Sequence, residues 1–416
     1  MSQLLQPVRG TADLMPEGKA RHNHVIERAR NAAALYGFED MATPIFEFTE
    51  VFSRPLGASS DVVSKETYSF EDRGGTGLTL RPEGTAAVMR AILSNGLTQT
   101  LPQKLFYAGP MFRYERPQKG RMRQFHQIGA ELIGPAHGLA DAEIIALGAR
   151  ILGDLGVLDR CKLHLNTLGD DASRAAYREA LVSYFRQHEG DLSADSQRRL
   201  AENPLRILDS KDAGDRAILV EAPKLPDFLN AESTAHFAHV TAALDAANID
   251  WILDPLLVRG LDYYSHTAFE FITDALGAQG TVLGGGRYDG LSETLGGPRL
   301  PAVGFAAGVE RLALLLEAPA QLAPDVLMLA ADEAALPLCF ELAETLRHHK
   351  VSVDLPLSGN MGKKMKRADK LGVRYVVIMG SDELANNTVQ LRDMGDGSQV
   401  EIARDALPQS LIKAGE

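Results

Sequence analysis

The sequence contains only two cysteines, Cys161 and Cys339, among 416 residues. Two thiols so far apart argue against a disulfide framework and against a cysteine-based zinc site, and we expect both to be inert. The first residues lack the apolar core of a signal peptide, and no uninterrupted apolar run reaches the roughly 18 residues of a membrane span. These absences favour a cytoplasmic protein without a membrane anchor.

Two familiar nucleotide-binding motifs are also missing. The chain has no Gly-Lys-Ser/Thr and no G-x-G-x-x-G after a predicted strand. This excludes a phosphate loop of the Lys-Ser/Thr kind and a Rossmann dinucleotide site. The formal net charge of -12 argues against non-specific coating of nucleic acid, although it leaves room for local basic surfaces.

The remaining composition is that of an ordinary globular protein, with 45% hydrophobic and 24% charged residues. A chain of this length is expected to form two or three domains. Apolar spacing predicts a helix at 18–36, followed by an extended segment at 38–48. Pro44 interrupts that segment, which suits an edge strand or a strand at an interface.

A basic hairpin is the most unusual feature of this acidic chain. Strands are predicted at 104–116 and 124–133, joined by the polar loop PQKGRMR. A planar guanidinium on a strand, such as that of Arg113, can bind a phosphate with two hydrogen bonds, and the loop can reach a larger polyanion. A solvated charged loop on an edge hairpin is the alternative. On the return strand, Gln127 and Glu131 occupy odd positions and therefore point to one face.

Sequence patterns after the hairpin predict a helical insertion and a second domain. A helix is expected at 139–157, and a segment rich in alanine, leucine and charge at about 170–250 predicts a helical insertion. Strand character resumes at 256–273, and EAPAQLAPD at 317–325 has the composition of a linker. Alternating strands and helices beyond it predict a separate α/β domain with a largely parallel sheet. The predicted domains are residues 1–325 and 326–416.

Two further motifs carry candidate binding residues on turns and strands. LRPEGT at 80–85 places Glu83 and Thr85 at a helix start, where Gly84 lets the backbone approach a ligand, although a helix cap is the alternative. LVRGLDYYSHTAFE at 257–270 carries Arg259 and two adjacent tyrosines. Adjacent strand residues point to opposite faces, so one tyrosine can line a cavity while the other packs; an ordinary aromatic strand is the alternative.

Two glycine-rich motifs complete the set. LGGGRYDG at 283–290 suggests a bulge or a close approach of ligand to backbone, and GFAAGVERL at 304–312 places Arg311 early in a helix. Taken together, the motifs put several arginines, two glutamates and several glycines on one predicted antiparallel sheet. Such a site suits ATP bound without a glycine-rich phosphate loop, beside a small cationic or N–H-rich substrate.

The motifs, taken in order, resemble those of a known family. Pro44 after a long helix, FRYE at 112–115 and GVER at 308–311 resemble the three motifs of class II aminoacyl-tRNA synthetases. LRPEGT, FRYERPQKGRMRQFHQIGAE, LVRGLDYY and LGGGRYDGL are similar to the signature segments of histidyl-tRNA synthetases. The resemblance covers nearly the whole chain. It implies an α+β fold: a class II antiparallel sheet with flanking helices, a helical insertion and a C-terminal α/β domain that binds the anticodon.

The resemblance also implies an activity and partners. It implies ATP-dependent activation of L-histidine to histidyl-adenylate, then transfer of histidine to the 3′ end of its cognate tRNA. Mg²⁺ would neutralise the β- and γ-phosphates, with no metal held by the protein itself. The segment with Pro44 would build a homodimer interface, and the helical insertion would reach the acceptor arm of the tRNA. A histidine-sensing regulatory paralogue and an ATP-using ligase without a tRNA partner are the alternatives.

Roles for single residues follow from the same resemblance. Arg259 and Arg113 are the implied catalytic residues, with Arg259 bridging the substrate carboxylate and the α-phosphate. The implied histidine-binding residues are Glu83, Gly84, Thr85, Gln127, Glu131, Arg259, Tyr263, Tyr264 and Tyr288. The implied ATP-binding residues are Arg113, Glu115, Arg121 and Arg311. The implied tRNA contacts are Arg116, Gln118, Lys119 and Arg123, with Lys363, Lys364, Lys366, Arg367 and Lys370 at the anticodon.

Overall fold

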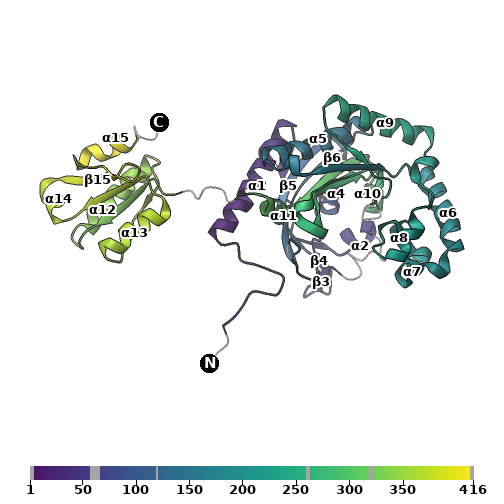
Figure 1. Cartoon of the computed structure of the whole chain (residues 1–416), viewed down its shortest axis with the longest axis horizontal. Coiled ribbons are helices and arrows are strands. Elements are labelled where there is room, and N and C mark those ends of the chain that lie inside the picture. The colour runs from purple at the N-terminus through teal and green to yellow at the C-terminus, as the bar shows by residue number, and fades with distance from the viewer. Residues whose placement is uncertain (1–3, 57–65, 119, 259–262, 318–322, 413–416) are drawn as a thin grey trace. The chain divides into compact units, whose positions relative to one another are not determined.

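The protein is described by a computed structural model that covers residues 4–56, 66–118, 120–258, 263–317 and 323–412 (Figure 1). The chain divides into two compact units, residues 1–319 and 320–416. Each unit has its own hydrophobic core. Among the described residues, no helix combines the length and apolar character that a membrane crossing requires.

The larger unit is built on an eight-stranded sheet with the strand order β1-β5-β6-β11-β10-β9-β7-β8. Neighbouring strands are antiparallel except at the two edges, where β1 pairs with β5 and β7 pairs with β8 in parallel. This confirms the predicted antiparallel sheet. The strands are β1 (Glu39–Met41), β5 (Gln103–Phe112), β6 (Gln124–Ile133), β7 (Lys162–Thr167), β8 (Ile252–Leu253), β9 (Ser265–Ile272), β10 (Thr281–Arg287) and β11 (Ala302–Gly308).

Helices cover both faces of this sheet (Figure 1). Successive side chains of β5 point to opposite faces of the sheet. Phe106 packs into the hydrophobic core on one face, and Tyr107 packs into the core on the other. The first face carries α1 (Pro16–Leu35), α5 (Gly138–Asp154) and α11 (Val309–Leu315). The second face carries α2 (Glu50–Leu56), α4 (Thr85–Ser94) and α10 (Leu291–Thr294).

A smaller antiparallel sheet lies beside α2 and α4. Its order is β2-β4-β3, with β2 (Phe46–Phe48), β3 (Tyr68–Glu71) and β4 (Gly77–Leu80). Pro44 lies between β1 and β2 and belongs to neither strand. This sheet leaves Phe46, Phe48 and Phe70 exposed to solvent.

The segment predicted as an insertion is helical, as expected. It contains α6 (Asp171–Gln187), α7 (Ala194–Glu202), α8 (Ala213–Leu219) and α9 (Ala231–Ala246). Tyr177, Leu181 and Phe185 of α6 centre a separate core, whereas α9 places Val240 and Leu244 in the core of the large sheet. The insertion is therefore anchored to the sheet through its last helix.

Two predicted strands are shorter than the sequence suggested. The strand predicted at 104–116 ends at Phe112, because the backbone N–H of Tyr114 donates to the carbonyl of Glu66 instead of to β6. The strand predicted at 256–273 begins only at Ser265. Part of it, residues 259–262, lies outside the described residues.

The smaller unit has a five-stranded sheet of order β13-β12-β14-β15-β16. The first three strands are parallel, but β14, β15 and β16 are antiparallel, so the prediction of a largely parallel sheet missed a C-terminal hairpin. The strands are β12 (Val326–Ala330), β13 (Val353–Asp354), β14 (Tyr375–Met379), β15 (Thr388–Asp393) and β16 (Gln399–Ala403). The helices are α12 (Leu336–His348), α13 (Met361–Leu371), α14 (Ser381–Asn386) and α15 (Leu407–Ile412).

Helix α13 presents most of its basic residues to solvent, but Lys364 is an exception. Lys364 is buried, and its Nζ donates to the carbonyl oxygen of Ala330 at 2.9 Å. The helix must turn one side towards the sheet, and position 364 falls on that side together with Ala368. Lys364 is thus a structural residue, and its inclusion in a nucleic-acid-binding face was wrong.

A buried ion pair ties α5 to β10 in the larger unit. Arg287 and Asp141 are both fully buried, and the guanidinium donates through Nε to both carboxylate oxygens at 3.1 Å and through Nη2 to Oδ2. Burial alone would raise the pKa of Asp141, but the Arg287 charge and the hydrogen bonds outweigh it and bring the pKa to about 2. The pair therefore stays charged at neutral pH.

Removing one partner should strongly destabilise the larger unit. We expect Arg287→Met to lower its free energy of unfolding by about 3–5 kcal/mol, because Asp141 is left as a buried charge without its partner. The urea midpoint of the larger unit measures this. Arg299→Met serves as the control, since Arg299 is half exposed and its ion pairs lie at the surface. Equal midpoints for the two variants would contradict the assigned role.

Candidate active site

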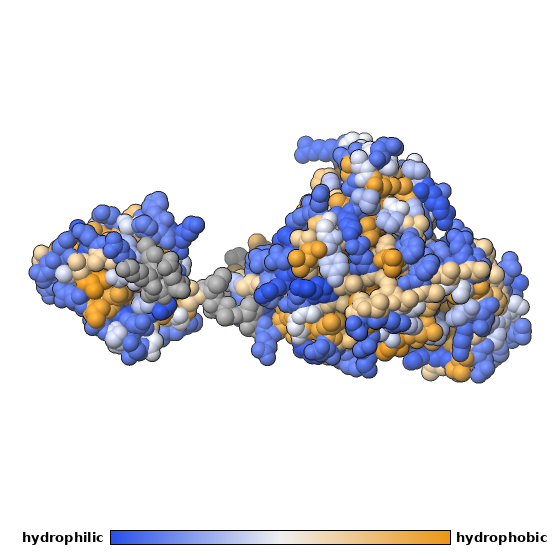
Figure 2. All heavy atoms as spheres, turned by 90° about the horizontal axis from the view of Figure 1, so that it is seen from above, coloured by the Kyte–Doolittle hydropathy of each residue, from blue (hydrophilic) through white to orange (hydrophobic). Residues whose placement is uncertain are grey.

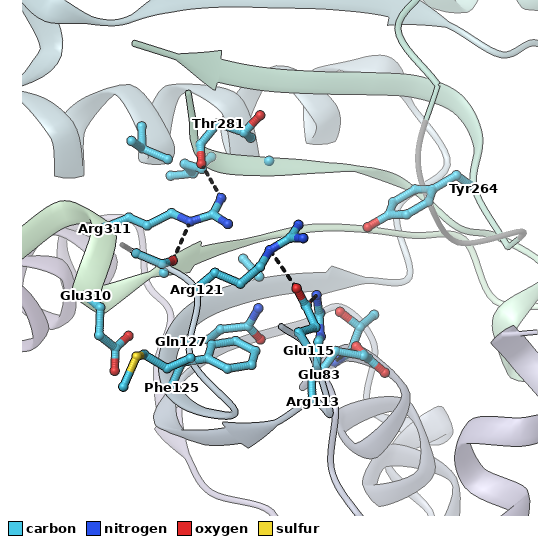
Figure 3. Close-up of a pocket in the computed structure, with 18 of the residues that line it drawn as sticks. Glu83, Arg113, Glu115, Arg121, Phe125, Gln127, Tyr264, Thr281, Glu310 and Arg311 are labelled. Carbon is cyan, nitrogen blue, oxygen red and sulfur yellow. Dashed lines mark hydrogen bonds and ion pairs between the residues drawn. The ribbon is translucent and has the colours of Figure 1, made fainter. Parts of the chain in front are cut away.

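A pocket opens where β6, β10 and β11 meet the loop that joins β5 to β6 (Figure 3). Its walls come from distant parts of the sequence, from the turn before α4 to the start of α11. Because antiparallel pairing sets β11 between β6 and β10, these segments converge on one site. The lining includes Glu83, Thr85, Arg113, Glu115, Arg121, Phe125, Gln127, Tyr263, Tyr264, Thr281, Glu310 and Arg311.

A fully buried carboxyl group, that of Glu131, lies behind one end of the pocket. Thr85 Oγ1 donates to its Oε1 at 2.7 Å, and the Tyr107 hydroxyl donates to the same oxygen at 3.3 Å. The Tyr288 hydroxyl donates to Oε2. Three hydroxyl groups from α4, β5 and the end of β10 thus surround one acid.

Glycines make the room for this arrangement. A Cβ on Gly304 would lie 1.7 Å from Oε2 of Glu131, and a Cβ on Gly129 would lie 2.2 Å from the Tyr107 ring. Gly84 faces the same ring, with a hypothetical Cβ at 2.3 Å. Any other residue at these positions would displace the acid or the tyrosine.

Burial controls the protonation of Glu131. Desolvation raises its pKa to about 8, assisted by the neighbouring charge of Glu83, although the hydroxyl donors act in the opposite direction. The group is therefore mostly protonated at neutral pH. It can donate or accept a hydrogen bond, which suits a ring that carries both a donor and an acceptor nitrogen.

Glu83 and Gln127 supply acceptors nearer the pocket opening. Glu83 accepts hydrogen bonds from the backbone N–H groups of Thr85 at 2.5 Å and Ala86 at 3.0 Å, so the helix-cap interpretation of LRPEGT is correct. Burial raises the pKa of Glu83, which those N–H groups and Arg113 partly offset. Oε1 of Gln127 is buried and has no hydrogen-bond partner among the described residues. A ligand with several N–H donors would satisfy both side chains.

Three guanidinium groups converge at the other end of the pocket. Arg121 forms an ion pair with Glu115 at 2.6 Å, and Arg113 lies 3.9 Å from the same carboxylate (Figure 3). Arg311 is held by the carbonyl oxygens of Gly120 and Thr281 at 3.1 and 2.8 Å. Burial lowers the pKa of Arg311, and so do the nearby charges of Arg121 and Arg113. One carboxylate among three cations leaves this end ready for a polyanion.

The aromatic residues predicted from the sequence lie together. Tyr263 and Tyr264 have ring centroids 4.7 Å apart, and the Tyr288 ring is 5.8 Å from that of Tyr263. The hydroxyl of Tyr264 points into the pocket (Figure 3). Tyr288 is buried beside Glu131 and does not line the opening. Arg259 lies outside the described residues, as does Lys119.

The residues expected to contact nucleic acid lie in and beside the loop that joins β5 to β6. Arg116 and Gln118 are exposed, and Gln118 pairs with Arg121 in a tight turn. Arg123 is partly buried: its guanidinium stacks on the Tyr114 ring with a separation of 4.0 Å. Arg123 therefore also has a structural role in fixing the loop.

Among the residues of this site that were not identified from the sequence are Tyr107 and Arg287. Tyr107 contacts Glu131, and Arg287 holds the strand end that carries Tyr288. The pairing of Tyr107 with Gly129 across β5 and β6 is the signal that could have revealed the first, because a large residue opposite a glycine indicates a filled space. No local pattern reveals Arg287, since its partner lies 146 positions away.

The pKa of Glu131 generates a pH-dependent prediction. Its folded-state pKa of about 8 lies above the ordinary value of 4.5. The protonated acid therefore makes its full contribution to the free energy of unfolding below about pH 4.5. That contribution is lost as the pH rises through about 8. Relative to Glu131→Gln, which does not titrate, the wild type should lose up to about 4 kcal/mol of unfolding free energy between pH 5 and 8.

Urea midpoints of both proteins across this pH range measure the difference. Glu71→Gln, on the exposed edge of the small sheet, controls for the loss of a surface carboxylate. A constant difference between wild type and Glu131→Gln from pH 5 to 8 would show that Glu131 does not titrate there.

Comparison with known proteins agrees with this geometry. The family model described as "Histidyl-tRNA synthetase" matches residues 10–312, and that described as "Anticodon binding domain" matches residues 325–414. The chain is 56% identical to a "Histidine--tRNA ligase" of Gluconacetobacter diazotrophicus over 97% of both sequences. It is also 56% identical to one from Rhodospirillum rubrum, over 98% of this chain and 99% of that sequence.

A solved structure supports the same assignment. The apo histidyl-tRNA synthetase of S. aureus superposes with a TM-score of 0.83 at 36% identity. The alignment covers 98% of this chain and 100% of that one. Similarity of sequence, fold and motif order over nearly the full length confirms the resemblance, and the chain belongs to the histidyl-tRNA synthetase family.

Proposed function

We propose that this protein is a histidine–tRNA ligase, which activates L-histidine with ATP and transfers it to the 3′ end of the cognate tRNA. The observation that carries the proposal is the pairing of two chemically distinct ends in one pocket. One end has a buried acid among hydroxyl groups, and the other has three converging guanidinium groups. The close relatives named above support the same activity.

Histidine occupies the end near Glu131. Glu83, Thr85 and Gln127 hold its α-amino group, which supplies the donors that the buried Gln127 oxygen lacks. Glu131 and Tyr264 bond the two imidazole nitrogens, while Tyr263, Tyr288 and Gly84 shape the space. An apolar side chain of similar size offers no nitrogen to Glu131 and Tyr264, so the same contacts supply selectivity.

ATP occupies the basic end, with Arg113 and Arg311 on its phosphates and Glu115 and Arg121 beside the nucleotide. A carboxylate oxygen of histidine attacks the α-phosphorus, and the bond from that phosphorus to the bridging oxygen breaks to release pyrophosphate. The carboxylate is already ionised at neutral pH, so no general base is needed. Arg113 and Arg259 offset the charge that gathers at the five-coordinate phosphorus. Mg²⁺ enters with ATP as part of the substrate.

The second step uses the hairpin loop. A ribose hydroxyl at the 3′ end of the tRNA attacks the carbonyl carbon of the adenylate, and AMP leaves. Arg116, Gln118, Lys119 and Arg123 contact the acceptor end, where cations neutralise phosphate and Gln118 can read a base edge. Exposed basic residues of α13, such as Lys363 and Lys366, contact the anticodon. Residues 326–416 form the anticodon-binding domain, and residues 1–325 the catalytic domain.

We also propose a homodimer built on the segment around Pro44. The small sheet exposes Phe46, Phe48 and Phe70 next to Ile45, an apolar surface that pairing would remove from water. Figure 2 shows other hydrophobic residues scattered among hydrophilic ones over the face in view. We expect the dimer to work in the cytoplasm.

Exchange between ATP and labelled pyrophosphate, measured with each of the twenty amino acids and no tRNA, tests the activation step. We expect exchange with histidine alone. Absence of exchange with every amino acid, from folded protein with Mg²⁺, would favour a regulatory paralogue. Exchange without charging of tRNA would favour a ligase that has no tRNA partner.

Two neighbouring arginines should separate the two steps. We expect Arg113→Ala to reduce histidine-dependent exchange at least about 100-fold, because a phosphate loses its guanidinium in the transition state. The matched variant Arg116→Ala should retain exchange but charge tRNA more slowly, with a weaker salt dependence of tRNA binding. Near-normal exchange by Arg113→Ala would remove that residue from the mechanism.

A further inference from the structure

A group of three side chains outside the proposed substrate contacts has the composition of a transition-metal site. His22 comes from α1, His126 from β6 and Glu310 from α11, and one ligand atom of each lies within 4.8 Å of the others. Glu310 borders the pocket, where its carboxylate points away from the Arg311 guanidinium (Figure 3). His126 and Glu310 lie within the sequence motifs described above, but no role was assigned there to any of the three side chains.

We propose that His22, His126 and Glu310 bind a first-row divalent transition metal such as Zn²⁺. Two imidazoles and one carboxylate form a known zinc ligand set, and imidazole disfavours Mg²⁺ and Ca²⁺, which prefer oxygen ligands alone. The site is therefore distinct from the Mg²⁺ that accompanies ATP.

The distances are close to those that a tetrahedral ion requires. With metal–ligand bonds of about 2.0–2.1 Å, neighbouring ligand atoms lie about 3.4 Å apart. Oε1 of Glu310 is 2.9 Å from Nδ1 of His126 and 3.8 Å from Nε2 of His22, so the required value falls between the two. Shifts of about half an ångström would bring each of these two distances to that value.

The ring geometry agrees with the atomic distances. The His22 and His126 ring centroids are 5.0 Å apart, and their planes meet at 83°. Two imidazoles bound to one tetrahedral ion have centroids about 5 Å apart, given the same bond lengths. The rings thus already have nearly the separation of two ligands to a common ion.

Hydrogen bonds and packing around the three side chains also support a metal site. The His126 backbone N–H donates to both Glu310 oxygens at 2.9 Å, which fixes the carboxylate as an outer-shell donor does in metal sites. His22 is 4% exposed, and its Nδ1 has no hydrogen-bond partner among the described residues. Its other ring nitrogen, Nε2, faces Oε1 of Glu310 at 3.8 Å, which is too long for a hydrogen bond. The partial exposure of His126 and Glu310 gives an ion access from the pocket side.

Zinc binding by the full chain tests the proposal, measured by competition with a chromophoric zinc indicator in the absence of ATP. We expect one equivalent of Zn²⁺ per chain in the wild type, unaffected by a large excess of Mg²⁺. His22→Ala should weaken binding at least tenfold. The matched control His24→Ala, two positions along the same helix, should bind as the wild type does.

Three outcomes would overturn the proposal. These are no stoichiometric binding by the wild type, equal binding by His22→Ala, and loss of binding in His239→Ala instead, which would move the ion to the stacked His137–His239 pair. His22→Gln, which keeps the side-chain volume, provides a second variant should alanine at this buried position disturb folding. Retention of binding by folded His22→Gln would equally reject the site.

Discussion

The burial of one carboxyl group, that of Glu131, sets the design of the substrate pocket. Water cannot solvate this acid, so the protein must supply its hydrogen bonds, and it does so with hydroxyl groups of Thr85, Tyr107 and Tyr288. Each hydroxyl comes from a different element. The acid therefore fixes how closely α4, β5 and β10 approach, and the glycines at 84, 129 and 304 follow as a steric requirement.

The basic end of the pocket differs from the acid end in its electrostatics. At the acid end, burial raises the pKa of the Glu131 carboxyl group, whereas at the basic end three guanidinium groups lie close to one another. Backbone carbonyls and Glu115 hold them in place only in part, so an incoming polyphosphate gains from interactions that are already oriented. In the function that we propose, side chains would do for ATP what a glycine-rich phosphate loop does with backbone N–H groups.

Sequence reasoning reached the class of fold and most of the candidate pocket because its residues sit in contiguous motifs. The odd positions of β6 did bring Gln127 and Glu131 to one face, as strand alternation requires. Contacts between distant segments were not accessible in this way. The Asp141–Arg287 pair, the Tyr107 hydroxyl and the approach of His22 to Glu310 each depend on which strands and helices become neighbours, and no local period encodes that. The C-terminal hairpin was missed although Val389 and Leu391 in β15, and Val400 and Ile402 in β16, alternate with polar residues.

The strand order of the large sheet has a consequence for synthesis of the chain. β11 is the last of the eight strands in sequence, yet it lies between β6 and β10 at the centre. Before β11 has been synthesised, β6 and β10 each lack the partner strand that lies between them in the complete sheet. Unpaired strand edges invite pairing with other nascent chains. A chain terminated before residue 302 lacks the strand that joins β6 to β10, and with it the side of the pocket formed by Glu310 and Arg311.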